Sequence, residues 1–93
     1  MLVTVHGKRW QMQFGRTPTG WYGFCDTPNQ PKKRIILRPS LRKNHQLLLD
    51  TTIHEMLHAG GPILDEDFVD TMATDIARAL IKIGWRLPSG PNL

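Results

Sequence analysis

The 93-residue chain has one cysteine, Cys25, only two glutamates, and no apolar run long enough to cross a bilayer. A single cysteine excludes a disulfide within the chain and is typical of proteins from reducing compartments. The first eight residues do not show the charged and then apolar pattern of a secretion signal. These absences predict a cytoplasmic protein that does not contact a membrane.

The length of the chain is enough for one hydrophobic core. Residues 1–93 fit a single domain, which at this size buries somewhat more than ~60% of the surface of its unfolded chain. Residues 88–93 are rich in Pro, Gly and Ser and predict a loose tail. Because such a core is modest, a bound metal ion would add stability as well as chemistry.

The first half of the chain predicts β structure. Residues 3–6 and 9–14 alternate apolar and polar side chains around a Gly-Lys turn, which is typical of a hairpin with one buried face. Residues 15–31 are rich in Gly, Pro, Thr and aromatic residues and predict an irregular loop. Residues 33–38 predict one further strand. We expect all three tryptophans to anchor the core.

The second half predicts two amphipathic helices. The first covers residues 46–59, with Asn44 as its N-cap and a Gly-Gly-Pro stop after it. The second begins after the N-cap Asp65 and ends near Gly84. Its apolar stripe consists of Val69, Met72, Ala73, Ile76, Leu80 and Ile83. The predicted fold is α+β: a hairpin and one further strand packed on an antiparallel helical hairpin.

The segment His54-Glu55-Met56-Leu57-His58 lies in the first predicted helix and has the pattern HExxH. Two histidines four residues apart face the same way on a helix, so both imidazoles can hold one zinc ion. The glutamate between them lies beside that ion, where it can accept a proton from a zinc-bound water. The alternative, two exposed or core-packed histidines, is disfavoured by the helical context.

Helical geometry predicts two sides for the first helix. At 100° per residue, the predicted core side carries Leu49, Ile53, Met56 and Leu57. The histidine side carries Leu47, Thr51, His54 and His58, with Glu55 and Leu48 alongside. Because the histidines lie off the apolar side, a role in core packing explains them less well.

A catalytic zinc ion needs a third protein ligand and an open position for water. The short connection between the helices predicts that residue 58 faces about residue 66 and residue 54 about residue 70. Glu66 is the predicted third ligand, because a carboxylate near the interior needs a cation to offset its desolvation. A first-turn acid favoured by the helix dipole is its simpler explanation. The alternative ligands are Asp70, which can instead accept the free N–H of a ligating imidazole, and Asp65, which capping explains better.

Four residues outside the predicted helical hairpin are weaker candidates. Cys25 can approach the zinc ion as an inhibitory fourth ligand, although packing is the simpler explanation. Tyr22 and His45 carry donors of the kind that a developing oxyanion needs. His6 lies in the predicted β-hairpin and is interpreted as a surface histidine.

Charge is distributed unevenly along the chain. Residues 1–45 contain nine Lys or Arg and one acid, whereas residues 46–93 contain three Lys or Arg and seven acids. The basic segment 32–43 is a candidate surface for nucleic acid or an acidic peptide. A solvated strand edge whose lysines discourage aggregation is the favoured alternative, because no recognised nucleic-acid-binding motif accompanies the charge.

The chain resembles the small zincin-type (HExxH) metallopeptidases encoded by tailed bacteriophages and prophages. The resemblance is carried by residues 50–59, 64–69, 75–80 and 84–86, and more weakly by residues 25–28 and 34–39. It implies a minimal zincin domain with Zn²⁺ on His54 and His58 and with Glu55 as general base, acting in the host cytoplasm. By analogy with larger zincins, the strand at 34–37 would line the cleft and pair with an extended substrate.

These observations predict a zinc-dependent hydrolase, most directly a metallopeptidase acting on a peptide or protein. The first alternative is a catalytically inactive zinc-binding module for a host or virion protein. The second is a basic nucleic-acid-binding protein that uses residues 32–43.

Overall fold

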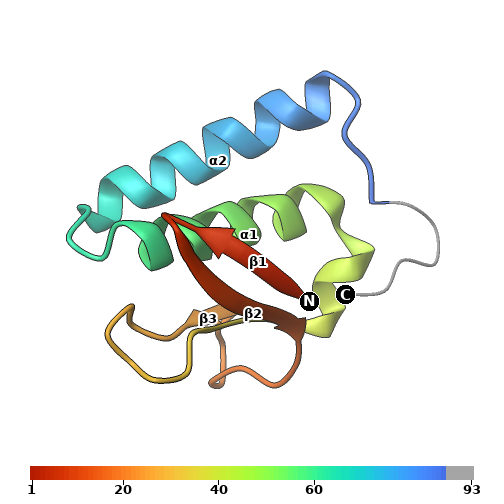
Figure 1. The fold of residues 1–93 in the computed structure, drawn as a ribbon. Helices are drawn as coiled ribbons and strands as arrows, with labels where there is room; N and C mark the ends of the chain where they lie inside the picture. The colour runs from red at the N-terminus through yellow and green to blue at the C-terminus, as the bar shows by residue number, and fades with distance from the viewer. Residues whose placement is uncertain (88–93) are drawn as a thin grey trace.

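The computed structural model describes residues 1–87, so the tail predicted at 88–93 lies outside the described residues. A four-stranded sheet packs against the first of two antiparallel helices, and the second helix packs on the first, which confirms the α+β class (Figure 1). The elements are β1 (Leu2–Val5), β2 (Lys8–Phe14), β3 (Gly23–Cys25), β4 (Arg34–Leu37), the 3-10 helix η1 (Pro39–Lys43), α1 (His45–Gly60) and α2 (Glu66–Lys82). Neither helix in this part of the chain is long and apolar enough to cross a membrane.

The N-terminal hairpin forms as the alternation predicts. Strands β1 and β2 pair antiparallel, with Val5 opposite Lys8. The two turn residues, His6 and Gly7, have φ angles of 48° and 78°. Two consecutive positive φ angles are the mark of the type I′ turn, so the turn lies one residue earlier than predicted. His6 is exposed at its tip, as the sequence indicated.

The sheet has the order β1-β2-β4-β3, in which β4 runs parallel to β2 and antiparallel to β3. The prediction of an irregular loop over residues 15–31 is therefore wrong at β3. This strand has only three residues between turn-rich flanks, and its pairing with β4 rather than its own pattern stabilises it. Because β2 and β3 occupy both sides of β4, the edge strand at this end of the sheet is β3.

The core lies between the sheet and the helices. Trp10 on β2 is 1% exposed and packs with buried residues of β4, η1 and α1. The prediction that every tryptophan anchors this core is wrong for Trp21, which is 54% exposed, and Trp85 is only partly buried. Sequence composition alone does not distinguish a tryptophan on a buried strand from one on an exposed loop.

Both helices begin where their caps predict. The side chain of Asn44 accepts a hydrogen bond from the Leu47 amide at 3.0 Å, and Asp65 accepts one from the Phe68 amide at 3.1 Å. These bonds satisfy amide groups that the first helical turn leaves without partners. The caps therefore set the start of α1 and α2 and hence the relative register of their side chains.

The predicted sides of α1 are partly wrong. The buried residues of this helix are Leu48, Leu49, Thr51, Glu55 and Ala59, whereas Ile53, Met56 and Leu57 are only partly buried. The reason is that α1 packs against both the sheet and α2, so it has two contact faces instead of one. The helix is consequently turned so that Glu55 points inward.

Candidate metal centre

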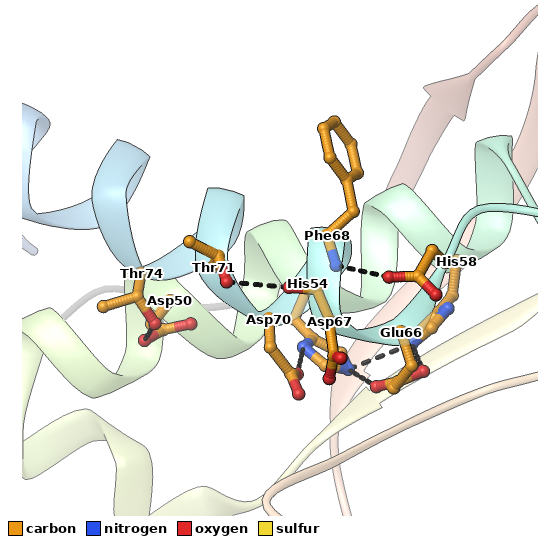
Figure 2. Close-up of polar contacts among 10 residues, drawn as sticks. Asp50, His54, His58, Glu66, Asp67, Phe68, Asp70, Thr71 and Thr74 are labelled. Atoms are coloured by element: carbon orange, nitrogen blue, oxygen red, sulfur yellow. Dashed lines mark hydrogen bonds and ion pairs between the residues drawn. The ribbon is translucent and has the colours of Figure 1, made fainter.

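Three polar contacts join the facing sides of α1 and α2 at intervals of one helical turn (Figure 2). The first joins Asp50 to Thr74, with 2.9 Å between Oδ2 and Oγ1. The second joins His54 to Asp70, with 3.1 Å between Nδ1 and Oδ1. The third joins His58 to Glu66, with 3.2 Å between Nε2 and Oε2. The helical hairpin thus brings residues 54 and 70, and residues 58 and 66, face to face, as the short connection predicts.

The donor atoms of His54, His58 and Glu66 converge on one point. The two Nε2 atoms are 3.0 Å apart, and they lie 3.3 Å and 3.2 Å from the Glu66 carboxylate oxygens. Ligands placed tetrahedrally about zinc at bonds of about 2.0–2.1 Å are separated by about 3.3 Å. The set therefore fits a small divalent ion with a fourth position open, although this geometry does not single out zinc.

Asp70 and Asp65, the alternative third ligands, have other partners. Asp70 faces Nδ1 of His54, the ring nitrogen on the side away from the cluster. An N–H donated there leaves the lone pair of Nε2 directed at the other donors, which is how outer carboxylates orient metal-binding histidines. Asp65 is occupied as the N-cap of α2. Glu66 is the one of the three that joins the histidine cluster.

Glu55 lies behind the cluster, at the wall of the cavity described below. The residue is 9% exposed and makes no hydrogen bond or ion pair within residues 1–87, and its carboxylate oxygens are not fully enclosed. Burial raises the pKa of Glu55 above its ordinary value, and the neighbouring His54 and His58 oppose that shift. A buried carboxylate without a partner is costly, which makes a nearby cation or a bound water the natural means of offsetting the cost.

Gly23 on β3 permits the close approach of that strand to Glu55. A Cβ atom at this position would lie 2.8 Å from Cγ2 of Thr51 and 2.9 Å from Oε2 of Glu55. Only a residue without a side chain fits between β3 and α1 here. The sequence analysis missed this residue, because a glycine in a segment rich in turn residues gives no signal of a packing role.

A cavity of about 730 Å³ opens beside the cluster. Its walls come from the segment before β3, from β3 itself, and from the facing sides of α1 and α2. The prediction that the strand at 34–37 lines the cleft is wrong, because no residue of β4 is among the lining residues and both of its edges are paired. The strand beside the cavity is β3.

Some of the weaker candidates line the cavity, and others do not. Tyr22 lines the cavity, whereas His45 lies near Trp85, with ring centroids 6.2 Å apart, and does not line it. The expectation that His45 serves an oxyanion is therefore wrong. Cys25 lines the cavity but is outside the donor cluster, and its Sγ donates to the Asp26 carbonyl at 3.1 Å.

The state of the Cys25 thiol also disfavours a role as metal ligand. Burial, reinforced by the charges of Glu55 and Asp26, raises the pKa of Cys25 to about 12. The thiol is therefore neutral in the metal-free protein, and its position outside the donor cluster is what favours a packing role. This agrees with the simpler explanation drawn from the sequence.

Two arginines of the basic segment 32–43 have partners within the described residues. Arg34 forms an ion pair with Asp26 at 2.8 Å. Arg42 lies over the ring of Phe14, 4.2 Å from its centroid. A surface for nucleic acid on this segment stays a prediction.

Comparison with family models, with curated proteins and with solved structures found no match to this chain. The comparisons therefore assign the chain to no family.

Proposed function

We propose that this protein is a zinc-dependent hydrolase, most directly a metallopeptidase with a minimal zincin-like site. The observation that carries the proposal is the convergence of three donor atoms, two from α1 and one from α2, beside a buried and unpartnered carboxylate. A pair of imidazoles with one carboxylate is a ligand set found in zinc peptidases.

In this proposal His54, His58 and Glu66 hold the ion, and Asp70 orients the ring of His54 through its Nδ1–H. These residues would hold a zinc ion, which when bound would supply Lewis-acid chemistry, activating a water to a pKa of about 7 and polarising a substrate carbonyl. Glu55 accepts the proton of the attacking water and then returns a proton to the departing amine.

An extended substrate is proposed to pair with β3. Within the described residues this strand pairs only with β4, so its other edge is free. Strand addition to a free edge gives main-chain hydrogen bonds and places alternate side chains toward the cavity. This replaces the earlier expectation that residues 34–37 would receive the substrate.

The test compares the wild-type chain with Glu55→Gln. Both are expected to bind one zinc ion by elemental analysis, because Glu55 is not in the donor cluster. The variant should lose hydrolysis of a mixed peptide pool by at least about 100-fold, since general acid–base groups contribute at least that much. Equal cleavage by both proteins would place catalysis elsewhere. Zinc binding without hydrolysis in either protein would favour the inactive zinc-binding module.

A further inference from the structure

The cavity beside the donor cluster is lined by four carboxylates, and within residues 1–87 no lysine or arginine lines it. We propose that this cavity selects cationic peptides, a proposal that rests on the peptidase function above. The recognised group is an ammonium or guanidinium next to the scissile bond, from a Lys or Arg side chain or a free N-terminus. Asp50 is the residue that receives it.

The roles proposed above use three of the four carboxylates of the cavity. Glu66 belongs to the ion, Asp70 faces His54, and Glu55 serves the attacking water. When the two histidines are neutral ligands, a divalent ion offsets two of the four negative charges and leaves a net charge of −2. Asp50 has no role in that chemistry. The cavity therefore carries more negative charge than the metal site requires.

Asp50 is held in position one turn before His54, about 6 Å along the axis of α1. Its Oδ2 accepts a hydrogen bond from the hydroxyl of Thr74 at 2.9 Å. No basic side chain pairs with it in the part of the chain that the structure describes. Figure 2 shows the pair Asp50 and Thr74 one helical turn away from the pair His54 and Asp70, on the same facing sides of the helices. A positioned carboxylate next to a reaction centre is a natural partner for a substrate cation.

Two further observations indicate a ligand in this cavity. Glu55 is more than nine-tenths buried, lines the cavity, and has no described polar partner. The cavity also carries the rings of Trp21 and Tyr22, which are 54% and 49% exposed. Exposed aromatic faces attract cations. Arg38 occupies the Tyr22 ring, 5.5 Å from its centroid, whereas within residues 1–87 no cation lies over the Trp21 ring.

The experiment uses the zinc-loaded chain and internally quenched peptides that differ at one position. Lys, norleucine or Glu is placed in turn at each of the two residues on either side of the scissile bond, and each peptide is made with a free or an acetylated N-terminus. We expect kcat/KM to favour the best Lys or free-amine peptide over its matched Glu or acetylated counterpart by at least about tenfold. Selectivity that survives acetylation identifies the side chain as the source, and selectivity lost on acetylation identifies the N-terminus.

The variant Asp50→Asn keeps an oxygen for the Thr74 hydroxyl and removes the charge. It should reduce the selectivity ratio at least about fivefold. The matched control is Asp75→Asn, which removes a charge from an exposed position of α2 outside the cavity and should keep the wild-type ratio. A ratio near one in the wild type, or a ratio that Asp50→Asn does not change, would overturn the proposal.

A binding measurement separates this proposal from the peptidase function. The zinc-loaded Glu55→Gln protein is titrated calorimetrically with the uncleaved Lys and Glu peptides and with the free and acetylated pair. Tighter binding of the cationic member supports cation selection even if no peptide is cleaved, an outcome that would refute only the hydrolase. If the variant binds both members of a pair equally and the wild type hydrolyses peptides, only cation selection is refuted.

Discussion

The Nδ1 atom of His54 on α1 lies 3.1 Å from Oδ1 of Asp70 on α2. This contact favours a proton on Nδ1, which directs the lone pair of Nε2, 3.0 Å from its counterpart on His58, toward the donor cluster. The proposed metal centre therefore depends on a carboxylate that is not in the donor cluster, supplied by the opposite helix.

Asp70→Asn is expected to weaken zinc binding by about 10- to 100-fold, because an amide orients the imidazole of His54 less firmly and does not raise its basicity as a carboxylate does. Competition with a chromophoric chelator measures the change. Asp67→Asn, which removes a charge from an exposed position in the same part of α2, is the control and should keep the wild-type affinity. Equal losses in both variants would mean that net charge, and not the contact with His54, matters.

Glu66 and Asp65 are adjacent in sequence but should respond differently to substitution by alanine. Glu66→Ala removes a donor from the cluster and should abolish most of the zinc affinity with little change in the stability of the metal-free protein. Asp65→Ala removes the cap of α2 and should lower the free energy of unfolding by about 1 kcal/mol.

Competition with a chelator measures the zinc affinity of each variant, and urea unfolding without metal measures its free energy of unfolding. If Asp65→Ala loses zinc as severely as Glu66→Ala while remaining folded, the assignment of the third ligand is wrong.

Gly23→Ala is expected to destabilise the protein by about 1–3 kcal/mol, because the added methyl group overlaps Thr51 and Glu55. Urea unfolding measures the loss. The second substitution Thr51→Ser removes the Cγ2 atom that the new methyl group would meet, so the double variant should recover part of the stability. A Gly23→Ala protein as stable as the wild type would show that β3 does not approach α1 as closely as described.

Acid should remove the stabilising effect of Asp26. Its carboxylate accepts hydrogen bonds from Nε and from the backbone amide of Arg34, and the side-chain bond is the main reason that the pKa of Asp26 is lowered below its ordinary value. A carboxylate with a lowered pKa stabilises the fold above its unfolded pKa, near 4, and loses that effect as pH falls through the folded value.

Urea unfolding of wild type and Asp26→Asn tests this pH dependence. The wild type should be the more stable at about pH 7, and the difference should shrink steadily below about pH 4. A difference that stays constant down to about pH 2 would assign the effect of the substitution to packing and not to charge.

The sequence predicted those parts of the site that lie within one helix. His54, Glu55 and His58 lie within five consecutive residues of α1, and the caps Asn44 and Asp65 act on their own helices. Helical periodicity and capping are local, so they can be deduced without knowing the neighbours. The α+β order followed from the same local patterns.

The tertiary structure alone decided how the sheet meets the site. The burial of Glu55 beneath Gly23 and the place of β3 at the edge of the sheet join segments far apart in the sequence. Such contacts depend on how the sheet and the two helices pack together. No local pattern encodes that packing, because α1 contacts two partners at once and its inward side is the result of both.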